Sequence, residues 1–340
     1  MSAPVPMTVV TGFLGSGKTT LIANLLRRPE LSRTAVIINE FGEIGLDHEL
    51  IESSEEDLVE LSTGCLCCVM RGDLTNAVHR LMEKRGEGRP FERIVLETTG
   101  LADPAPIVHA AIADPALRAL VSLDRVAVTV DALTGIASLE AHEESRRQIA
   151  LADVLLLTKT DVDDSGVAAL RDRIAAVNPD ADILFPVRGE IDPVVIIGGA
   201  TASLGGRRKA RVPDENTGSL DHDHLDHAHG HGSDEITSVS LRLDKPLQAV
   251  ALTLFLQALA ETMGPDLLRL KGIVEVAEAP DTPAVVHGVQ HVFHPMRWLD
   301  GWPGGARDSR LVMIGKGLSE PWVRALLDTI IEEVAEASGQ

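Results

Sequence analysis

A glycine-rich stretch at residues 8–20, TVVTGFLGSGKTT, has the residue types and spacing of a phosphate-binding loop. Gly12, Gly17, Lys18 and Thr19 fill the pattern G-x-x-x-x-G-K-[ST], directly after a short apolar run and directly before a helical run. Glycines let the backbone curl so that successive N–H groups point at phosphate oxygens, and the helix adds its dipole. The lysine neutralises the β- and γ-phosphates, and the threonine hydroxyl reaches Mg²⁺. The alternative is a turn that binds nothing, and the agreement of the flanking runs favours the nucleotide site.

A carboxylate follows the apolar run RIVL of residues 93–96, because Glu97 comes next and Gly100 lies three residues later. A carboxylate at the carboxyl end of a strand can hold Mg²⁺ through water or orient an attacking water, and a glycine N–H can meet the γ-phosphate. The alternative is an exposed glutamate before a turn. Beside a phosphate-binding loop, we expect Glu97 and Lys18 to be catalytic and Gly100 to bind nucleotide.

A third polar group ends the apolar run of residues 154–157, which leads into Thr158, Lys159 and Asp161. A carboxylate at the last position can accept both N–H groups of a guanine edge, and the lysine stem can cover the face of the base. The segment is similar to the guanine motif N-K-x-D, with Thr158 in place of asparagine. GTP is therefore the expected nucleotide, and a strand end capped by Asp161 is the alternative.

All three cysteines lie in the segment GCLCC, at Cys65, Cys67 and Cys68. Three thiolates within four residues suit a tetrahedral soft ion such as Zn²⁺, whereas a disulfide between adjacent cysteines would be strained. Glu40 or Glu43 in the segment NEFGE can supply a fourth ligand, or a water can leave the site open for transfer. A redox sensor and buried inert thiols remain as alternatives, and each glutamate can equally be a solvated loop charge.

Five of the twelve histidines lie in an aspartate-rich tract, at His222, His224, His227, His229 and His231. Neutral imidazoles beside carboxylates bind Zn²⁺, Co²⁺ or Ni²⁺. On a flexible segment, such a tract would load metal weakly and hand it on, or would only buffer it. The alternative is a solvated acidic linker.

A second group of histidines, His287, His291 and His294, lies among β-branched residues, which predict a strand. On a strand, His287 and His291 would share a face and His294 would point away. We therefore expect packing or client-contact roles for these side chains rather than a three-histidine metal site.

The elements that position these groups alternate between short apolar runs and helical runs. Most of the predicted strands are apolar along their whole length, as in a parallel sheet buried on both faces. The fold class is therefore α/β, a P-loop NTPase with a mostly parallel sheet. The predicted strands are residues 7–10, 34–38, 58–61, 93–96, 125–130, 154–157 and 183–186. The predicted helices are residues 19–28, 73–84, 104–112, 143–150 and 166–177.

A change of composition divides the chain into three parts. Residues 198–235 are rich in Gly, Ser, Asp and His and are expected to form a flexible linker between a GTPase domain at 1–197 and a small α+β domain at 236–340. In the last part we expect strands at 236–243, 268–276, 284–293 and 310–314, and helices at 246–263 and 321–335. The final helix would place Trp322, Leu326, Ile330 and Val334 on one side.

The overall charge and composition restrict the class of partner. The 340-residue chain has a formal charge of −20, 3% aromatic residues and no tyrosine. Such a surface repels nucleic acid and anionic membranes, and no apolar stretch reaches the length of a membrane helix. The N-terminal segment lacks the pattern of a signal peptide, and three clustered cysteines cannot form a disulfide framework. These features favour a cytoplasmic protein without nucleic-acid or membrane partners.

Several stretches together resemble the CobW-type P-loop GTPases, relatives of the GTPases that insert nickel into urease and hydrogenase. They are GFLGSGKTT, INEFGEIGLD, GCLCC and ETTGLADP in the first part, and KGIV, HGVQHVFH and SRLVMIG in the last. The resemblance implies a GTP-dependent metallochaperone that uses GTP and Mg²⁺ and delivers a metal to a client metalloprotein. It assigns phosphate binding to Gly12, Gly15, Ser16, Gly17, Lys18, Thr19 and Thr20, and metal binding to Cys65, Cys67 and Cys68.

The interpretation from sequence is a GTPase that binds and delivers a divalent transition metal. Zn²⁺ is the expected cargo, and Co²⁺, in a cobalamin pathway, is the alternative. The loop at residues 40–47 lies between the phosphate-binding strand and the cysteine strand, so we expect it to sense the γ-phosphate and alter the thiol site. A metal store with structural nucleotide binding and a P-loop kinase are the competing classes, and Glu97 with Asp161 disfavours the kinase.

Overall fold

A computed structural model describes residues 3–38, 58–60, 69–87, 90–197, 235–305 and 307–338. The N-terminal part contains strands β1 (Val5–Gly12), β2 (Thr34–Ile38), β3 (Leu58–Glu60), β4 (Arg93–Glu97), β5 (Val121–Asp131), β6 (Val154–Thr158) and β7 (Asp182–Leu184). Its helices are α1 (Lys18–Leu26), α2 (Val69–Gly86), α3 (Ala105–Ala113), α4 (Pro115–Leu120), α5 (Gly135–Ala141), α6 (Glu143–Leu151), α7 (Val167–Val177) and α8 (Val194–Ile197).

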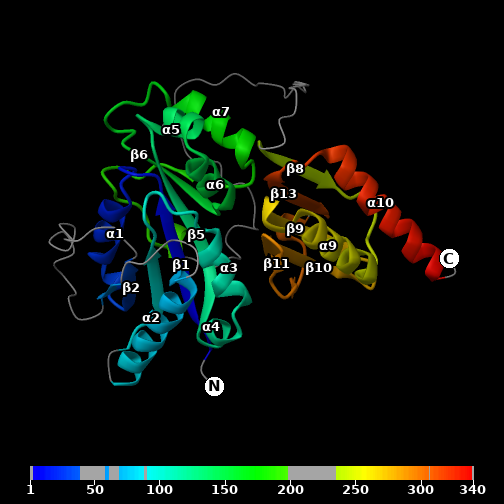
Figure 1. The fold of residues 1–340 in the computed structure, drawn as a ribbon, viewed down its shortest axis with the longest axis horizontal. Helices are drawn as coiled ribbons and strands as arrows, with labels where there is room; N and C mark the ends of the chain where they lie inside the picture. Colours follow the sequence, from blue (N-terminus) through cyan, green and yellow to red (C-terminus); the bar gives the residue numbers. More distant parts are fainter. Residues whose placement is uncertain are drawn as a thin grey trace.

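The C-terminal part continues with another set of strands and two long helices. The strands are β8 (Ile236–Arg242), β9 (Leu267–Val276), β10 (Ala279–Val289), β11 (Val292–Phe293), β12 (Arg297–Trp298) and β13 (Arg310–Lys316). The helices are α9 (Ala249–Met263) and α10 (Glu320–Ala337). Figure 1 shows the two parts side by side, with α9 and α10 on the side of the second sheet away from the first part.

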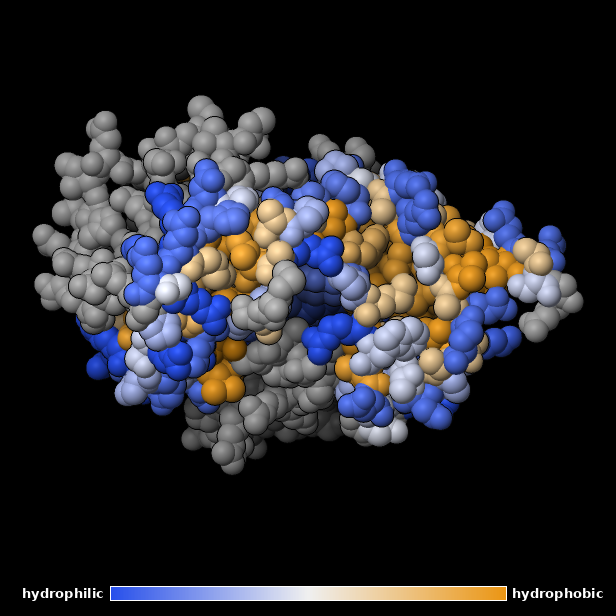
Figure 2. Space-filling view, turned by 90° about the horizontal axis from the view of Figure 1, so that it is seen from below, coloured by the Kyte–Doolittle hydropathy of each residue, from blue (hydrophilic) through white to orange (hydrophobic). Residues whose placement is uncertain are grey.

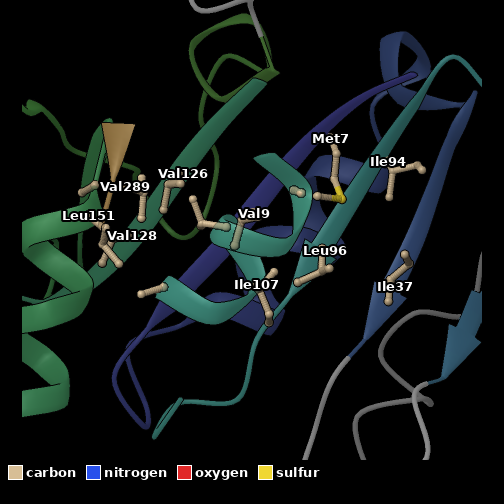
Figure 3. Packing of buried hydrophobic residues seen from close by; sticks show 14 of the residues in the cluster. Met7, Val9, Ile37, Ile94, Leu96, Ile107, Val126, Val128, Leu151 and Val289 are labelled. Atoms are coloured by element: carbon tan, nitrogen blue, oxygen red, sulfur yellow. The ribbon is translucent and has the colours of Figure 1, made fainter. Parts of the chain in front are cut away.

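The first sheet has seven parallel strands in the order β3-β2-β4-β1-β5-β6-β7. Successive side chains of a strand point to opposite faces, so Val9 packs with α2, α3, α6 and α7, whereas Val10 packs with α1 and α8. Figure 3 shows the first of these layers, where Val9, Leu96 and Ile107 meet. Because β1 lies between β4 and β5, the loop that follows β1 lies beside the carboxyl ends of both neighbours. The predicted α/β fold is confirmed.

The second sheet is antiparallel, in the order β11-β10-β9-β13-β8, with β12 paired to β10. Its own core forms against α9 and α10 around Phe255, Leu270 and Leu327. On α10 the buried stripe runs through Val323, Leu327, Ile330 and Val334, so Trp322 and Leu326 lie at its margin instead of its centre. Apolar surface is visible over this part of the molecule in Figure 2. Val250 and Leu254 of α9 are exposed.

The two parts share a buried interface. Val289 of β10 is 1% exposed and packs in the core of the first part, beside Leu151 (Figure 3). Asp153, directly before β6, accepts hydrogen bonds from Arg269 and Lys271 of β9. The interface therefore combines apolar packing with a buried cluster of one carboxylate and two cations.

Two kinds of local difference separate the predicted elements from the observed ones. The helix predicted at 73–84 begins earlier, at Val69, and α4 and α5 were not predicted. The strand predicted at 284–293 is interrupted by a turn, in which Gln290 has a φ of 53°, so β10 and β11 form a hairpin. Residues 198–234 of the predicted linker lie outside the described residues. Within the described part of the chain, no helix has both the length and the apolar character needed to cross a membrane.

Candidate functional site

The phosphate-binding loop connects β1 to α1, as the motif predicts. Gly17 precedes α1 with a φ of 90°, a left-handed conformation that favours glycine. Gly12 lies against β5, where an added Cβ would be 2.2 Å from Oγ1 of Thr129. Ser16 fixes the other end of the loop, because its Oγ lies 2.6 Å from the same Thr129 hydroxyl. The loop is thus held directly above the carboxyl end of β5.

Lys18 and Thr19 place a cation, a hydroxyl and a carboxylate close together. The Lys18 Nζ donates to the carbonyl oxygens of Gly12 at 2.9 Å and Phe13 at 3.3 Å, so its charge lies inside the loop. The Thr19 Oγ1 donates to Oε1 of Glu97 at 3.0 Å. A hydroxyl and a carboxylate are oxygen ligands that suit Mg²⁺, so Thr19 and Glu97 fit this ion.

The loop after β4 packs closely on the phosphate-binding loop. The Thr98 Oγ1 donates to Oγ1 of Thr11 at 2.7 Å, which joins the ends of β4 and β1. A Cβ added to Gly100 would be 2.8 Å from the backbone nitrogen of Leu14, a contact that only glycine avoids. The backbone of Gly100 is therefore next to the expected phosphate position.

The segment after β6 is tied to the same loop. The Thr158 Oγ1 donates to the carbonyl oxygen of Ser16 at 2.8 Å. The Lys159 Nζ donates to the carbonyl oxygen of Gly15 at 2.9 Å and to Oδ2 of Asp131 at 2.6 Å. Both side chains thus hold the phosphate-binding loop against β6, and the hydroxyl of Thr158 fulfils this role without an amide.

Asp161 lies at an open cavity of about 600 Å³, formed with Arg28, Val187, Arg188, Glu190, Ile191 and Asp192. The turn that carries Arg188 packs against α1, since the Asn24 Nδ2 donates to the carbonyl oxygen of Arg188 at 3.0 Å. A Cβ added to Gly189 would be 3.3 Å from Cγ2 of Thr20, which is itself exposed. The cavity is large enough for a purine base, and Asp161 is the carboxylate at its edge.

Two histidines of the C-terminal part come together, contrary to the expectation from strand alternation. The rings of His287 and His294 are stacked with centroids 4.7 Å apart, because the turn after β10 brings the chain back. Burial lowers the pKa of His287 well below its usual value, and the nearby Lys271 and Arg269 lower it further. Burial likewise lowers the pKa of His294 to about 4. The surrounding cations favour neutral imidazoles and disfavour a metal ion at this pair.

The predicted ligands of the transition metal all lie outside the part of the chain that the structure describes. Cys65, Cys67, Cys68, Glu40 and Glu43 lie outside the described residues, as does the histidine tract His222, His224, His227, His229 and His231. Among the residues that the structure does describe, no group of three or more His, Cys, Asp or Glu side chains could hold a metal ion. The thiol site therefore stays a prediction from sequence.

The structure adds side chains that the sequence did not single out. Asp131 pairs with Lys159, and Thr129 contacts the phosphate-binding loop. Both lie in the last three residues of β5, so their position at the carboxyl end of a strand was the available signal. Gln148 of α6 is 1% exposed and donates to the carbonyl oxygens of Gly100 and Ala102. A glutamine in the middle of a helix gives no such signal.

Comparison with family models gives two matches along the chain. Residues 6–185 match the model described as CobW/HypB/UreG, nucleotide-binding domain. Residues 236–331 match the model described as cobalamin synthesis protein cobW C-terminal domain. The two matches correspond to the parallel sheet and to the antiparallel sheet.

Individual relatives are similar over nearly the whole chain. The zinc chaperone YjiA of Escherichia coli is 31% identical over 95% of this chain and 97% of its own. The zinc chaperone CobW of Pseudomonas aeruginosa is 33% identical over 97% of this chain and 92% of its own. A crystal structure of the Zn(II)-bound E. coli YjiA GTPase superposes with a TM-score of 0.71 and 26% identity, over 97% of this chain and 99% of that one. A Zn(II)-bound triple mutant of the same protein, with one glutamate and two cysteines replaced by alanine, gives the same values.

Proposed function

The chain belongs to the CobW/HypB/UreG family, and on this premise we propose that it hydrolyses GTP and uses the nucleotide cycle to bind zinc and deliver it to a client metalloprotein. The observation that carries the GTPase part is the 3.0 Å contact between Thr19 and Glu97 beside the buried Lys18. Lys18 and Thr19 begin helix α1, directly after the loop that follows β1, and Glu97 ends the neighbouring strand β4, so the three side chains converge where the phosphates of a triphosphate would lie.

Each residue of the site has a role in the proposed hydrolysis. Lys18 neutralises charge on the β- and γ-phosphates, and the backbone N–H groups of the loop bind their oxygens. Thr19 and Glu97 are the residues that would hold Mg²⁺, and the ion would neutralise negative charge on the phosphates. We also assign Glu97 to orient the attacking water and the backbone N–H of Gly100 to bind the γ-phosphate.

Selection of guanine is assigned to Asp161 at the rim of the 600 Å³ cavity. A carboxylate accepts two hydrogen bonds from the guanine edge, and an adenine presents no matching donor pair. Thr158 and Lys159 support this assignment indirectly, because they bind the carbonyl oxygens of Ser16 and Gly15 and so fix the start of the Asp161 segment. Asp161→Asn is expected to reduce the preference for GTP over ATP by at least tenfold.

The zinc part rests on the relatives and on the cysteines. Relatives with these two domains are named zinc chaperones, which supports zinc rather than cobalt as the cargo. Cys65, Cys67 and Cys68 are proposed as the transfer site, with Glu40 or Glu43 as a further ligand. A relative remains zinc-bound when one glutamate and two cysteines are replaced, so we also propose that the histidine tract at residues 222–231 is an additional, weaker loading site.

Phosphate release from GTP and from ATP, measured with and without Zn²⁺, tests the proposal. We expect GTP turnover that depends on Mg²⁺ and changes with zinc, and its loss in Lys18→Ala. The variant with Cys65, Cys67 and Cys68 replaced by serine should lose tight zinc binding, whereas a variant with the tract histidines replaced by alanine should retain it. Turnover that zinc leaves unchanged would support a metal store instead. Phosphate transfer to a small molecule rather than to water would indicate a kinase.

A further inference from the structure

Helix α6 holds the loop that follows Glu97. The Gln148 Nε2 donates to the carbonyl oxygens of Gly100 at 3.1 Å and Ala102 at 3.0 Å, and this side chain is 1% exposed. Both hydrogen bonds are buried, so breaking them without replacement is unfavourable. When this loop moves toward or away from a γ-phosphate, Gln148 must move with it or lose both hydrogen bonds.

The same helix contacts the C-terminal sheet on its other side. Ala150 packs with Ile236, Leu268 and Ile314 in one buried apolar cluster. Figure 1 shows α6 between the parallel sheet and strands β8, β9 and β13. A displacement of α6 therefore changes its packing against the second sheet, because packed interiors transmit small shifts.

A continuous series of ion pairs runs along α6 from the loop to the C-terminal sheet, and we refer to it as the α6 ion-pair chain. Asp103 accepts from Arg147 at 3.0 Å, and Arg147 also donates to Glu143 at 2.8 Å. Glu143 in turn accepts from Lys316 of β13 at 2.7 Å. Hydrogen bonds from Lys316 and Arg147 lower the pKa of Glu143 to about 2, so the carboxylate in the middle of this series stays charged near neutral pH.

We propose that Gln148 is a positioning residue for the loop after β4, and that α6 transmits the position of this loop to the C-terminal sheet through the α6 ion-pair chain. The kinetic part of this inference rests on the proposed GTP hydrolysis. The structural part needs only that a triphosphate and a diphosphate hold the loop differently. Contact between the C-terminal part and a client would then follow the state of the nucleotide.

Two variants separate the positioning role from the transmission. Gln148→Met keeps a similar length and volume but removes both donors, so the loop is no longer fixed. Lys316→Gln breaks the α6 ion-pair chain at the C-terminal sheet and leaves Gln148 in place. Arg324→Gln is the matched control, since it breaks an exposed pair with Glu320 on α10, away from α6.

The measurements are steady-state GTP kinetics and amide hydrogen exchange of full-length protein with GDP or a non-hydrolysable GTP analogue, each with Mg²⁺. Wild type and Arg324→Gln should show slower or faster exchange in residues 267–276 and 310–318 with the analogue than with GDP. Gln148→Met should lower kcat for GTP by about tenfold and change KM less than twofold. Lys316→Gln should abolish the difference in hydrogen exchange between the two nucleotide states and leave KM unchanged.

Three results would overturn the inference. One is an exchange difference that persists in Lys316→Gln, a second is unchanged kcat in folded Gln148→Met, and a third is no exchange difference in wild type. If Gln148→Met does not fold, the exchange result for Lys316→Gln decides the question alone. A wild type that shows the exchange difference but no GTP turnover would refute the proposed hydrolysis and leave the transmission supported.

Discussion

Replacement of Asp153 by asparagine tests how the two parts of the molecule are held together. The side chain is 6% exposed and accepts from Arg269, 4% exposed, and Lys271, 16% exposed. Burial alone would raise the pKa of Asp153, but Arg269 and Lys271 hold it well below its usual value. The carboxylate is therefore charged in the folded protein and compensates two cations from the other part.

The expected loss can be worked out from this arrangement. Asp153→Asn leaves two buried cations without a counter-charge, a change that costs about 3–5 kcal/mol. Arg269 and Lys271 both donate to Oδ1, and an asparagine oxygen in that position can still accept from them, so the lower end, about 3 kcal/mol, is expected. Glu320→Gln is the control, because it removes one partner of a pair that is 49% and 55% exposed, worth about 0.3–0.5 kcal/mol.

The assay is urea unfolding at pH 7.5, followed by tryptophan fluorescence. All three tryptophans, Trp298, Trp302 and Trp322, lie in the C-terminal part, so the signal reports on that part. A second substitution, Lys271→Met in the Asp153→Asn background, removes one uncompensated cation and should recover about 1 kcal/mol or more. A loss below about 1 kcal/mol in Asp153→Asn, or no recovery in the double variant, would refute the reasoning.

Three further predictions concern the site and the histidine pair. Gly100→Ala should lower kcat at least tenfold, because the added Cβ would collide with the backbone of Leu14. Gly86→Ala is the control and should leave kcat unchanged, because a Cβ there meets nothing within 4 Å. Equal kcat values for the two variants would contradict the close packing at Gly100. Glu97→Gln should lower kcat for phosphate release about 100-fold, while its KM for GTP stays within about threefold of the wild-type value. Retained turnover would exclude a catalytic role for Glu97. The folded pKa of His294, about 4, lies below the ordinary 6.5, so the unfolded chain takes up the proton first as the pH falls. Urea unfolding should therefore show about 2 kcal/mol less stability at pH 5 than at pH 7.5 from this group, and stability that rises on acidification would contradict it.

The parts of the site that could be predicted are those set by local sequence. Gly12, Lys18 and Thr19 belong to one short sequence motif, and its spacing predicts the end of β1, the turn and the start of α1. Glu97 ends one buried strand and Asp161 follows another, and parallel strands bring their carboxyl ends to one edge of the sheet. The confirmed family and α/β fold follow from the same local patterns.

The parts that could not be predicted depend on tertiary contacts. Gln148 reaches Gly100 only because α6 packs beside the loop after β4, and no periodicity in α6 indicates this. The stacking of His287 on His294 depends on a turn at Gln290. The β-branched residues around the histidines predicted an uninterrupted strand instead, so this turn was missed. The cysteine site and the domain boundaries remain predictions, since Cys65, Cys67 and Cys68 lie outside the described residues.

The most direct test of the central claim is the zinc affinity of the protein in its different nucleotide states. Zinc would be titrated against a competing chelator with no nucleotide, with GDP and with a non-hydrolysable GTP analogue, in each case with Mg²⁺. Coupling between hydrolysis and delivery predicts at least a tenfold difference between the analogue and GDP, which is about 1.4 kcal/mol. Equal affinities in all three states would contradict a chaperone driven by GTP.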